Sequence, residues 1–394
     1  SNLLGRDHML AAALLLSAAL AQGPSDEAIA IARESIILDG HIDMPYQVAS
    51  HGADISKFSE RMNFDYEKAM EGGVNAPFIV AYIAARFQET GGAKAEADRM
   101  IGLVEGIAYQ HPDKFEIARS VRDVRRITRD GRIAFPLGME NGAAIEGSLE
   151  NLVHFYDRGI RYITLTHGRV NHISDSSYDE ERKWGGLSPF GYLLVSAMND
   201  IGMMVDISHV TDEAFFDVMD VTRTPVVATH SSLRHFTPGF ERNMSDEMLL
   251  ALAENGGVLL IAFGSAFLTE EANGYSSRRE EAYEQHKERA GRRAMSEEDF
   301  NEEWEADNPY PYATVSDVAD HIDRVVDLVG LDHVGIGSDF DGLGDTLPIG
   351  LKDASDMPNL VQELLDRNYD RDDIELILGG NFMRVWREVE KARR

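Results

Sequence analysis

The stretch SIILDGHIDMPYQ, residues 35–47, has the apolar pattern of a buried β-strand up to Gly40 and then places His41 and Asp43 where apolar residues would continue. Successive side chains of a strand point to opposite faces, so positions 41 and 43 share one face. Such a pair predicts either a metal site or a hydrogen-bonded closure of the strand, and the short motif alone does not choose. The strand is followed by HIDMP, without the Gly-rich phosphate turn that usually follows the first strand of a doubly wound sheet.

The rest of the chain alternates short apolar runs with longer amphipathic stretches. We predict eight strands, at 35–42, 76–83, 132–138, 161–166, 202–207, 225–229, 256–263 and 333–338. Helices are predicted between them at 93–110, 148–157, 189–200, 211–220, 245–254 and 315–329, several of which begin after a good N-cap such as Ser188. Alternating strands and helices are typical of parallel sheets, and eight such units predict an α/β fold of the (β/α)8 TIM barrel type.

The composition excludes several classes of function. Lys and Arg number 38 against 68 Asp and Glu, a formal net charge of −30, so a nucleic acid would be repelled over most of the surface. The 394 residues, 43% of them hydrophobic, are enough for a large core. The absence of cysteine excludes disulfides, thiolate metal sites and a cysteine nucleophile. Any metal must therefore be bound by His, Asp and Glu.

Two segments differ from this pattern. An apolar run from Met9 to Ala21 is too short to cross a bilayer and ends in a small-x-small cleavage pattern. We expect residues 1–24 to be a signal peptide or an N-terminus derived from expression, with an apolar helix that packs on the domain as the alternative. Export to the periplasm or the medium follows if the segment is cleaved, and a cytoplasmic location if it is not. No other segment approaches the length of a transmembrane helix.

The second segment, residues 269–312, is densely charged and almost free of aliphatic side chains. It predicts a solvated helical insertion between the seventh and eighth strands, since charge runs usually form a solvent-facing surface. A lid over the site is the alternative.

Polar residues concentrate where the predicted strands end. In TIM barrels the active site lies at the C-terminal ends of the strands. Six of the eight strand ends carry a His, Asp or Glu, namely His41 with Asp43, Glu140, His167, His209, His230 and Asp339. Four of the 13 histidines of the chain fall at these ends. Independent structural roles would not concentrate this way, so the pattern predicts a metal-dependent active site.

The ligand types indicate the chemistry. Imidazoles and carboxylates without thiolates suit Zn²⁺ or another divalent transition metal. The candidate ligands are His41, Asp43, Glu140, His209 and His230. They exceed the needs of one catalytic zinc, whereas two metals bridged by Glu140 would lie about 3.5–4 Å apart and hold a bridging hydroxide. His167 and Asp339 remain for polarising a carbonyl and for proton transfer.

We expect structural roles for the remaining histidines. His321 falls in a helical or surface pattern, as do His111, His154 and His286. His172 and His235 lie in loops near the predicted site, where contact with a substrate is the alternative.

Seven stretches of the chain resemble the motifs of one known family in that family's order. They are LDGHIDMP, GMENG, LTHGRVN, VDISHV, ATHSSLRHF, ERNMSD and VGIGSDFDG. The family is the membrane dipeptidase (renal dipeptidase) family, zinc peptidases of the amidohydrolase superfamily, and the resemblance covers roughly residues 30–390. Residues 25–394 would then be a metal-dependent (β/α)8 hydrolase domain.

The resemblance implies a role for each site residue. His41 and Asp43 would bind one zinc, His209 and His230 the other, and Glu140 would bridge both. His167 would contact the scissile carbonyl and Asp339 would act as the acid/base residue. Asp341 shares a face with Asp339 by strand alternation, so the choice of Asp339 depends on the motif and on closeness to the strand end. Arg242 would bind the C-terminal carboxylate of the substrate, which suits a bidentate guanidinium.

The implied activity is that of a binuclear zinc dipeptidase that tolerates a D-residue at the C-terminal position and has some β-lactam hydrolysis. The family also implies a homodimer. Because the chain lacks the cysteines and the lipid-anchor signal of the mammalian members, we expect an exported soluble enzyme. The alternatives are an amidohydrolase acting on N-acyl amino acids or cyclic amides and, from a different class, a non-catalytic binding protein on the barrel.

Overall fold

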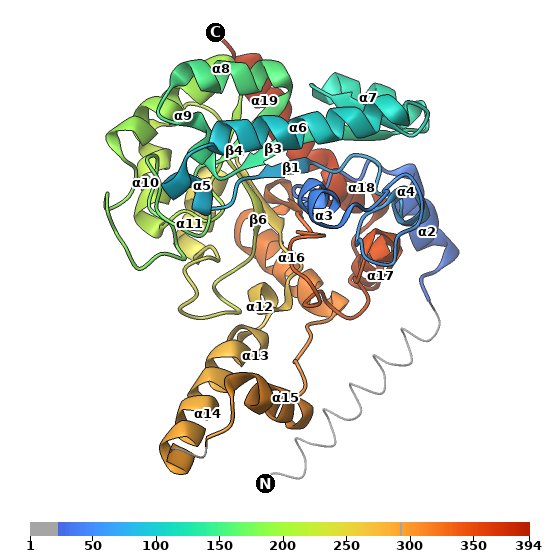
Figure 1. Cartoon of the computed structure of the whole chain (residues 1–394). Coiled ribbons are helices and arrows are strands. Elements are labelled where there is room, and N and C mark those ends of the chain that lie inside the picture. The colour runs from blue at the N-terminus through green and yellow to red at the C-terminus, as the bar shows by residue number, and fades with distance from the viewer. Residues whose placement is uncertain (1–22, 292–293) are drawn as a thin grey trace.

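The computed structural model describes residues 23–291 and 294–394, so the predicted signal segment lies almost entirely outside the described residues. The fold is α/β, with a parallel sheet surrounded by helices, consistent with a TIM-like barrel (Figure 1). The strands are β1 (Ile79–Tyr82), β2 (Phe115–Ala118), β3 (Ile133–Glu140), β4 (Ile160–Thr164), β5 (Met204–Asp206), β6 (Val227–Ser231), β7 (Val258–Ile261) and β8 (Val334–Ile336).

The α-helices alternate with these strands. They are α2 (Asp26–Glu34), α3 (Met44–His51), α4 (Tyr66–Gly72), α5 (Arg86–Thr90), α6 (Ala93–Gln110), α7 (Val121–Arg129), α8 (Leu149–Arg158), α9 (Pro189–Ile201), α10 (Asp212–Val221), α11 (Asp246–Glu254), α12 (Ser265–Leu268), α13 (Glu270–Asn273), α14 (Tyr275–Ala290), α15 (Glu297–Asp307), α16 (Val315–Val329), α17 (Met357–Asp366), α18 (Arg371–Glu375) and α19 (Asn381–Ala392). The predicted helices agree with α6, α8, α9, α10, α11 and α16 to within one residue at each end. Side-chain caps explain the sharp starts, as where Ser188 accepts the Gly191 amide ahead of α9.

The order of strands in the sheet is β1, β3, β4, β5, β6, β7 and β8, and β2 also pairs with β3. β1 pairs with the second half of β3 and β2 with the first half, so β3 serves two neighbours along its length. The register aligns Glu140 with Thr164, and Thr164 with Asp206, at the C-terminal ends of β3, β4 and β5. β2 was not predicted from the sequence, because four residues with only two buried side chains give little apolar pattern.

The prediction of a regular first strand at 35–42 is wrong. Only Ile42 makes β-bridges, to Ile79 and to Phe340. Even so, the segment lies between the two edges of the sheet, since Gly40 N donates to Ile336 O at 2.9 Å and Ile42 N donates to Phe78 O at 3.0 Å.

A side chain explains the irregularity. Asp39 Oδ1 accepts the amides of His41 and Ser338 at 3.0 and 2.9 Å, in place of backbone carbonyls. Gly40 is required here, because a Cβ at this position would lie 2.5 Å from Thr229 O on the opposite side of the sheet. The segment therefore closes the gap between β1 and β8 while it directs His41 and Asp43 to the C-terminal end.

The other end of the sheet is closed by α19. Phe78 lies 5.2 Å from the Trp386 ring and 5.0 Å from the Tyr162 ring, and these side chains belong to one buried apolar cluster with Met204 and Leu260. The cluster leaves the C-terminal ends of the strands as the open end.

The charged segment between β7 and β8 contains α13, α14 and α15. α14 and α15 project away from the rest of the chain and contact each other through Tyr283 and Phe300, whose rings lie 5.3 Å apart (Figure 1). The predicted helical character is confirmed, and α14 and α15 lie apart from the labelled strands in this view. Among the described residues, no helix is long and apolar enough to cross a membrane.

Candidate active site

The structure brings together all the predicted site residues at the C-terminal end of the sheet. Glu140 is the last residue of β3, His230 lies in β6, and His167 and His209 follow β4 and β5. His41 and Asp43 flank the bridge at Ile42, and Asp339 follows β8. The convergence arises because parallel strands place their C-terminal ends at one edge.

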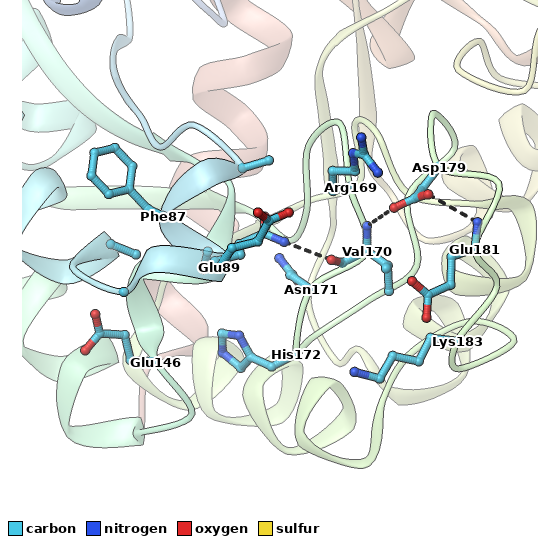
Figure 2. Close-up of a pocket in the computed structure, with 15 residues that line it drawn as sticks. Phe87, Glu89, Glu146, Arg169, Val170, Asn171, His172, Asp179, Glu181 and Lys183 are labelled. Carbon is cyan, nitrogen blue, oxygen red and sulfur yellow. Dashed lines mark hydrogen bonds between the residues drawn. The ribbon is translucent and has the colours of Figure 1, made fainter.

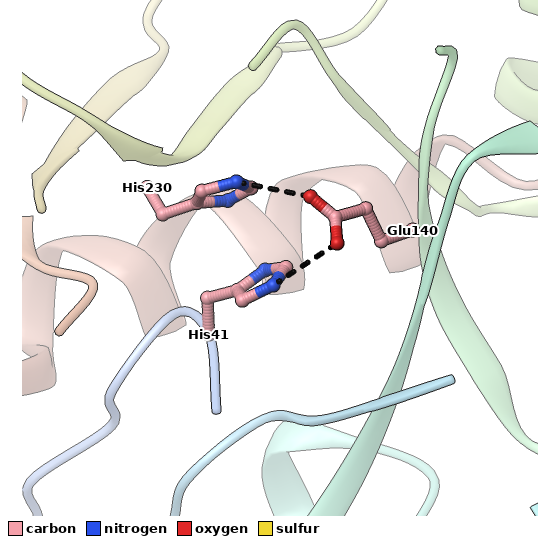
Figure 3. A group of neighbouring side chains, drawn as sticks. All are labelled: His41, Glu140 and His230. Carbon is pink, nitrogen blue, oxygen red and sulfur yellow. Dashed lines mark ion pairs between the residues drawn. The ribbon is translucent and has the colours of Figure 1, made fainter. Parts of the chain in front are cut away.

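Glu140 lies at the centre of this group. Its Oε1 lies 3.0 Å from His209 Nε2 and 3.1 Å from His230 Nε2, and its Oε2 lies 3.7 Å from His41 Nε2. Figure 3 shows the rings of His41 and His230 side by side, both directed at this carboxylate. Asp43 Oδ2 lies 3.6 Å from the same Nε2.

These donor atoms fit a metal better than they fit each other. His209 Nε2 and His230 Nε2 face each other at 2.9 Å, so two ring nitrogens and a carboxylate oxygen compete for the same space. His41 Nε2 and Asp43 Oδ1 are buried without a hydrogen-bond partner among the described residues. Three sets of potential ligand atoms, each within 4.8 Å of one another, overlap here: His41, Glu140 and His230; Glu140, His167 and His209; and His41, Asp43 and Asp339. Nitrogen and oxygen donors in this pattern suit zinc.

A second layer of hydrogen bonds fixes the tautomers of two rings. The Tyr162 hydroxyl donates to Gly40 O at 3.0 Å and therefore accepts from His41 Nδ1, also at 3.0 Å. Thr229 Oγ1 donates to Asp206 Oδ2 at 2.6 Å and accepts from His230 Nδ1 at 3.0 Å. Both rings thereby present the lone pair of Nε2 to the site, as metal-ligating histidines do.

The electrostatics of the buried group differ from residue to residue. Burial raises the pKa of Asp339 well above its ordinary value, and Asp43 and Glu140 add to this while His41 opposes it. Burial would also raise the pKa of Glu140, but His167 and His41 hold it well below its ordinary range. Burial lowers the pKa of His209 and of His230. The site therefore favours neutral imidazoles at these two positions and a carboxyl group at Asp339 that can hold a proton.

Backbone strain is concentrated in the same place. Within the described ranges, six residues other than glycine have positive φ, and four of them are Asn141, His209, Asp339 and Asp341. A left-handed backbone is unfavourable for a residue with a Cβ and persists only where the surroundings enforce it, commonly at functional sites.

A pocket of about 300 Å³ opens beside the group and contains Arg242. Arg242 is only 3% exposed, and its Nη1 and Nη2 donate to Ser231 Oγ and His230 O at 2.6 Å. Both acceptors are uncharged, and the guanidinium also lies 5.3 Å from the ring centre of Phe267. A buried cation with uncharged partners is suited to an anionic ligand.

Reasoning from the residue pattern alone missed several groups in this pocket. Arg242 was identified only through the motif ERNMSD, since a loop arginine is normally solvated. Tyr82, Tyr178 and Phe267 also line the pocket, and Tyr82 lies 4.9 Å from the His167 ring. Tyr82 ends β1, Tyr178 lies in the loop after β4 and Phe267 lies in α12. Such aromatic residues give no sequence signal of a site, because the residues they face are distant in the chain. Neither His172 nor His235 lines the pocket.

A second, larger cavity of about 510 Å³ lies between α5 and the loop after β4, and Figure 2 shows its lining. Gln88 Nε2 donates to Val170 O at 2.8 Å across it, and Gln88 Oε1 accepts from Asn141 Nδ2 at 2.9 Å. His172 lines this cavity and accepts the Gly147 amide at 3.1 Å. None of the predicted ligands lines it, and its connection to the site is the contact of Gln88 with Asn141, the residue after Glu140.

The chain is similar to known proteins in both sequence and fold. A family model described as Membrane dipeptidase (Peptidase family M19) matches residues 25–394. Dipeptidase aclJ of Aspergillus oryzae is 34% identical over 372 residues, which cover 91% of this chain and 79% of that protein. Mouse Dipeptidase 3 is 28% identical over 378 residues, 93% of this chain and 67% of that protein. The crystal structure of the probable dipeptidase PvdM from Pseudomonas aeruginosa superposes with a TM-score of 0.80 at 26% identity, over 93% of this chain and 98% of that one.

Proposed function

The chain belongs to the membrane dipeptidase family, peptidase family M19, and is a hydrolase of the metallopeptidase class; on that premise we propose that it is a binuclear zinc dipeptidase on a closed (β/α)8 barrel. The observation that carries the proposal is the pairing of two neighbouring sites. Ring nitrogens and carboxylates converge on Glu140, and a buried arginine with uncharged partners lines the adjoining pocket. The first suits metal ions and the second suits a carboxylate.

We assign His41 and Asp43 to one zinc, His209 and His230 to the other, and Glu140 to both. The 2.9 Å approach of the two Nε2 atoms and their shared contact with Glu140 Oε1 support the second pair, while Oε2 faces His41. Bound zinc would supply a Lewis acid and a water molecule that ionises near neutral pH.

The substrate is positioned by Arg242. Its remaining N–H groups can donate to the C-terminal carboxylate of a dipeptide, which places the peptide carbonyl one residue away, beside Glu140. A longer chain would put its carboxylate beyond the reach of Arg242 in a pocket of about 300 Å³. This spacing selects dipeptides.

Two further residues act on the peptide group. The His167 ring lies 4.4 Å from that of His209 and reaches the pocket, where its N–H can donate to the carbonyl oxygen as negative charge develops. Asp339 lines the same pocket, accepts the proton of the attacking water and passes it to the leaving amine. The raised pKa of Asp339 suits a group that must hold that proton between the two steps.

Metal analysis and a substrate panel test the proposal. We expect about two zinc ions per chain and turnover of dipeptides, including those with a D-residue at the C-terminal position. N-acyl amino acids, cyclic amides and β-lactams form the comparison set. If the zinc-loaded protein turns over these compounds and no dipeptide, the substrate assignment is wrong; if it binds no zinc and turns over nothing, the binding-protein alternative gains support.

The carboxylate contact is tested separately with Arg242→Lys. Lysine keeps the charge but loses the planar fork, so we expect KM for dipeptides to rise roughly thirtyfold. A dipeptide amide, which lacks the carboxylate, should be a poor substrate of the unchanged enzyme and should show no further loss in the variant. An equal loss on both substrates would mean that Arg242 supports the fold and does not bind the carboxylate.

The proposal also includes export and a homodimer. Determination of the mature N-terminus in the native host tests export. Light scattering of the zinc-loaded protein tests the dimer.

A further inference from the structure

The motif SDFDG contains two aspartates, and the structure separates them. Asp339 lines the pocket with Glu140 and Arg242. Asp341 is 3% exposed and lines a different cavity, of about 370 Å³, together with Asn63 and Lys68. The proposed mechanism uses the first carboxylate and leaves the second, buried one without a role.

Asp341 makes hydrogen bonds through all four of its polar atoms. Its N–H donates to Asn63 Oδ1 at 2.9 Å, and its carbonyl accepts from Gln47 Nε2 at 2.7 Å. Its carboxylate accepts the backbone amides of Asn63 at 2.6 Å and Phe64 at 3.3 Å. Gln47 belongs to α3, and Asn63 and Phe64 lie between α3 and α4, so one residue joins the loop after β8 to a segment near the start of the chain.

The loop that Asp341 holds is strained and closely packed. Asp339 has φ 61° and Asp341 has φ 66°, both in the left-handed region. Gly342 folds back against the site, since a Cβ there would lie 2.5 Å from Asp43 Oδ2 and even closer to Asp339 Oδ1. A displacement of Asp341 would therefore move the backbone on which the Asp339 carboxylate depends.

We propose that Asp341 is a positioning residue that holds Asp339 in place for proton transfer, through its bonds to Asn63, Phe64 and Gln47. The inference rests on the proposed function, in which Asp339 moves the proton. A carboxylate is required, because two backbone N–H groups approach its two oxygens. An asparagine would turn an N–H toward one of those donors.

The first test is Asp341→Asn in the zinc-loaded enzyme. We expect kcat for a dipeptide to fall about tenfold, KM to stay within about twofold and the zinc content to stay unchanged, because small misplacement of a catalytic group slows chemistry more than binding. Asn63→Ala removes the acceptor of the Asp341 amide, keeps the carboxylate contacts, and should lower kcat about threefold. It serves as the second variant if Asp341→Asn does not fold.

The matched control is Asp345→Asn in the same loop. The Asp345 side chain is 81% exposed and contacts Lys352 and the Tyr312 hydroxyl, so its kinetics should equal those of the unchanged enzyme.

The double variant Asp339→Asn with Asp341→Asn distinguishes positioning from general destabilisation. Since Asp341 acts through Asp339, its loss should lower kcat no further once Asp339 is already replaced. The inference would be overturned by an additional drop in kcat of about tenfold in the double variant. It would also be overturned by loss of zinc from Asp341→Asn, or by an unchanged kcat in both Asp341→Asn and Asn63→Ala when these variants fold. Full turnover by Asp339→Asn alone would instead contradict the proposed function.

Discussion

Among the described residues, fully buried imidazoles occur in two regions, at the C-terminal end of the sheet and on α16. His41 and His321 are both 0% exposed. In α16, His321 Nδ1 accepts the Leu233 amide at 3.1 Å and Nε2 donates to Leu268 O at 3.0 Å, so both nitrogens are bound by backbone. In the site, His41 uses Nδ1 for Tyr162 and directs Nε2 at carboxylates. Burial alone therefore does not distinguish a candidate metal ligand from a structural histidine, whereas the partners of the two ring nitrogens do.

The largest effect is expected from Glu140→Gln, which removes the charge shared by the site imidazoles. We expect loss of zinc and a fall in dipeptide turnover of at least about a thousandfold, because a carboxamide is a weak zinc ligand. Zinc content by mass spectrometry and dipeptide hydrolysis measure both effects. Glu146→Gln, at an exposed position six residues later, should change neither. If the Glu140→Gln enzyme keeps its full zinc content, Glu140 is not needed for metal binding, and the contrast drawn between the candidate metal site and His321 is wrong.

Asp339→Asn should have the next largest effect. It removes the proposed proton carrier and leaves the proposed ligands in place, so we expect roughly a thousandfold loss of kcat with an unchanged zinc content. Zinc stoichiometry and single-turnover kinetics check this result. If zinc is lost as well, Asp339 is itself a ligand, as its place in one of the three ligand groups permits.

His321, which has a structural role in α16, is expected to make the stability of the fold depend on pH. Burial lowers the pKa of His321 to about 4, against 6.5 in the unfolded chain. Between these values the unfolded state binds more protons than the folded state, so the contribution of His321 is full above pH 6.5 and falls as the pH drops toward 4. The total loss is about 3 kcal/mol.

Urea unfolding of the unchanged protein and of His321→Gln measures the contribution of His321 to the free energy of unfolding. The free-energy difference between the two proteins should shrink by roughly 2 kcal/mol from about pH 7 to about pH 5, since glutamine does not titrate. A difference that does not vary with pH would show that His321 titrates normally, and the two regions would then be less distinct than their contacts indicate.

The smallest effect is expected in the projecting helices, where charges are exposed and paired. Arg279 of α14 contacts Glu305 of α15, with side chains 32% and 46% exposed. Solvent screening limits such a pair to under about 1 kcal/mol in a double-mutant cycle of Arg279→Ala and Glu305→Ala. Dipeptide turnover should not change. A larger coupling energy, or altered kinetics, would show that these helices support the site.

The sequence predicted most of the site, because strand ends are marked locally. Glu140 ends an apolar run that forms a strand, His209 and Asp339 each follow one, and parallel strands bring their ends together. The same reasoning did not predict Arg242, whose burial depends on contacts with Ser231 and the distant Phe267.

Other long-range features have the same cause. The structural role expected for His321 agrees with its place in α16, but its burial comes from residues near Leu233 and Leu268, which are far from it in the sequence. The segment at 35–42 has the composition of a strand, but the Asp39 side chain replaces part of its backbone pairing. Local patterns describe elements well, whereas contacts between distant segments must be observed.

The way His41 is held has a consequence for biosynthesis. His41 O accepts the amide of Asp339 at 3.0 Å, and Gly40 is bonded to β8, so the first ligand segment is completed by residues nearly 300 positions later. A nascent chain that has emerged only as far as β7 contains every proposed zinc ligand but neither the proton carrier nor the strand that supports His41. With the proposed roles of these residues, we expect peptidase activity to begin only when synthesis is almost complete.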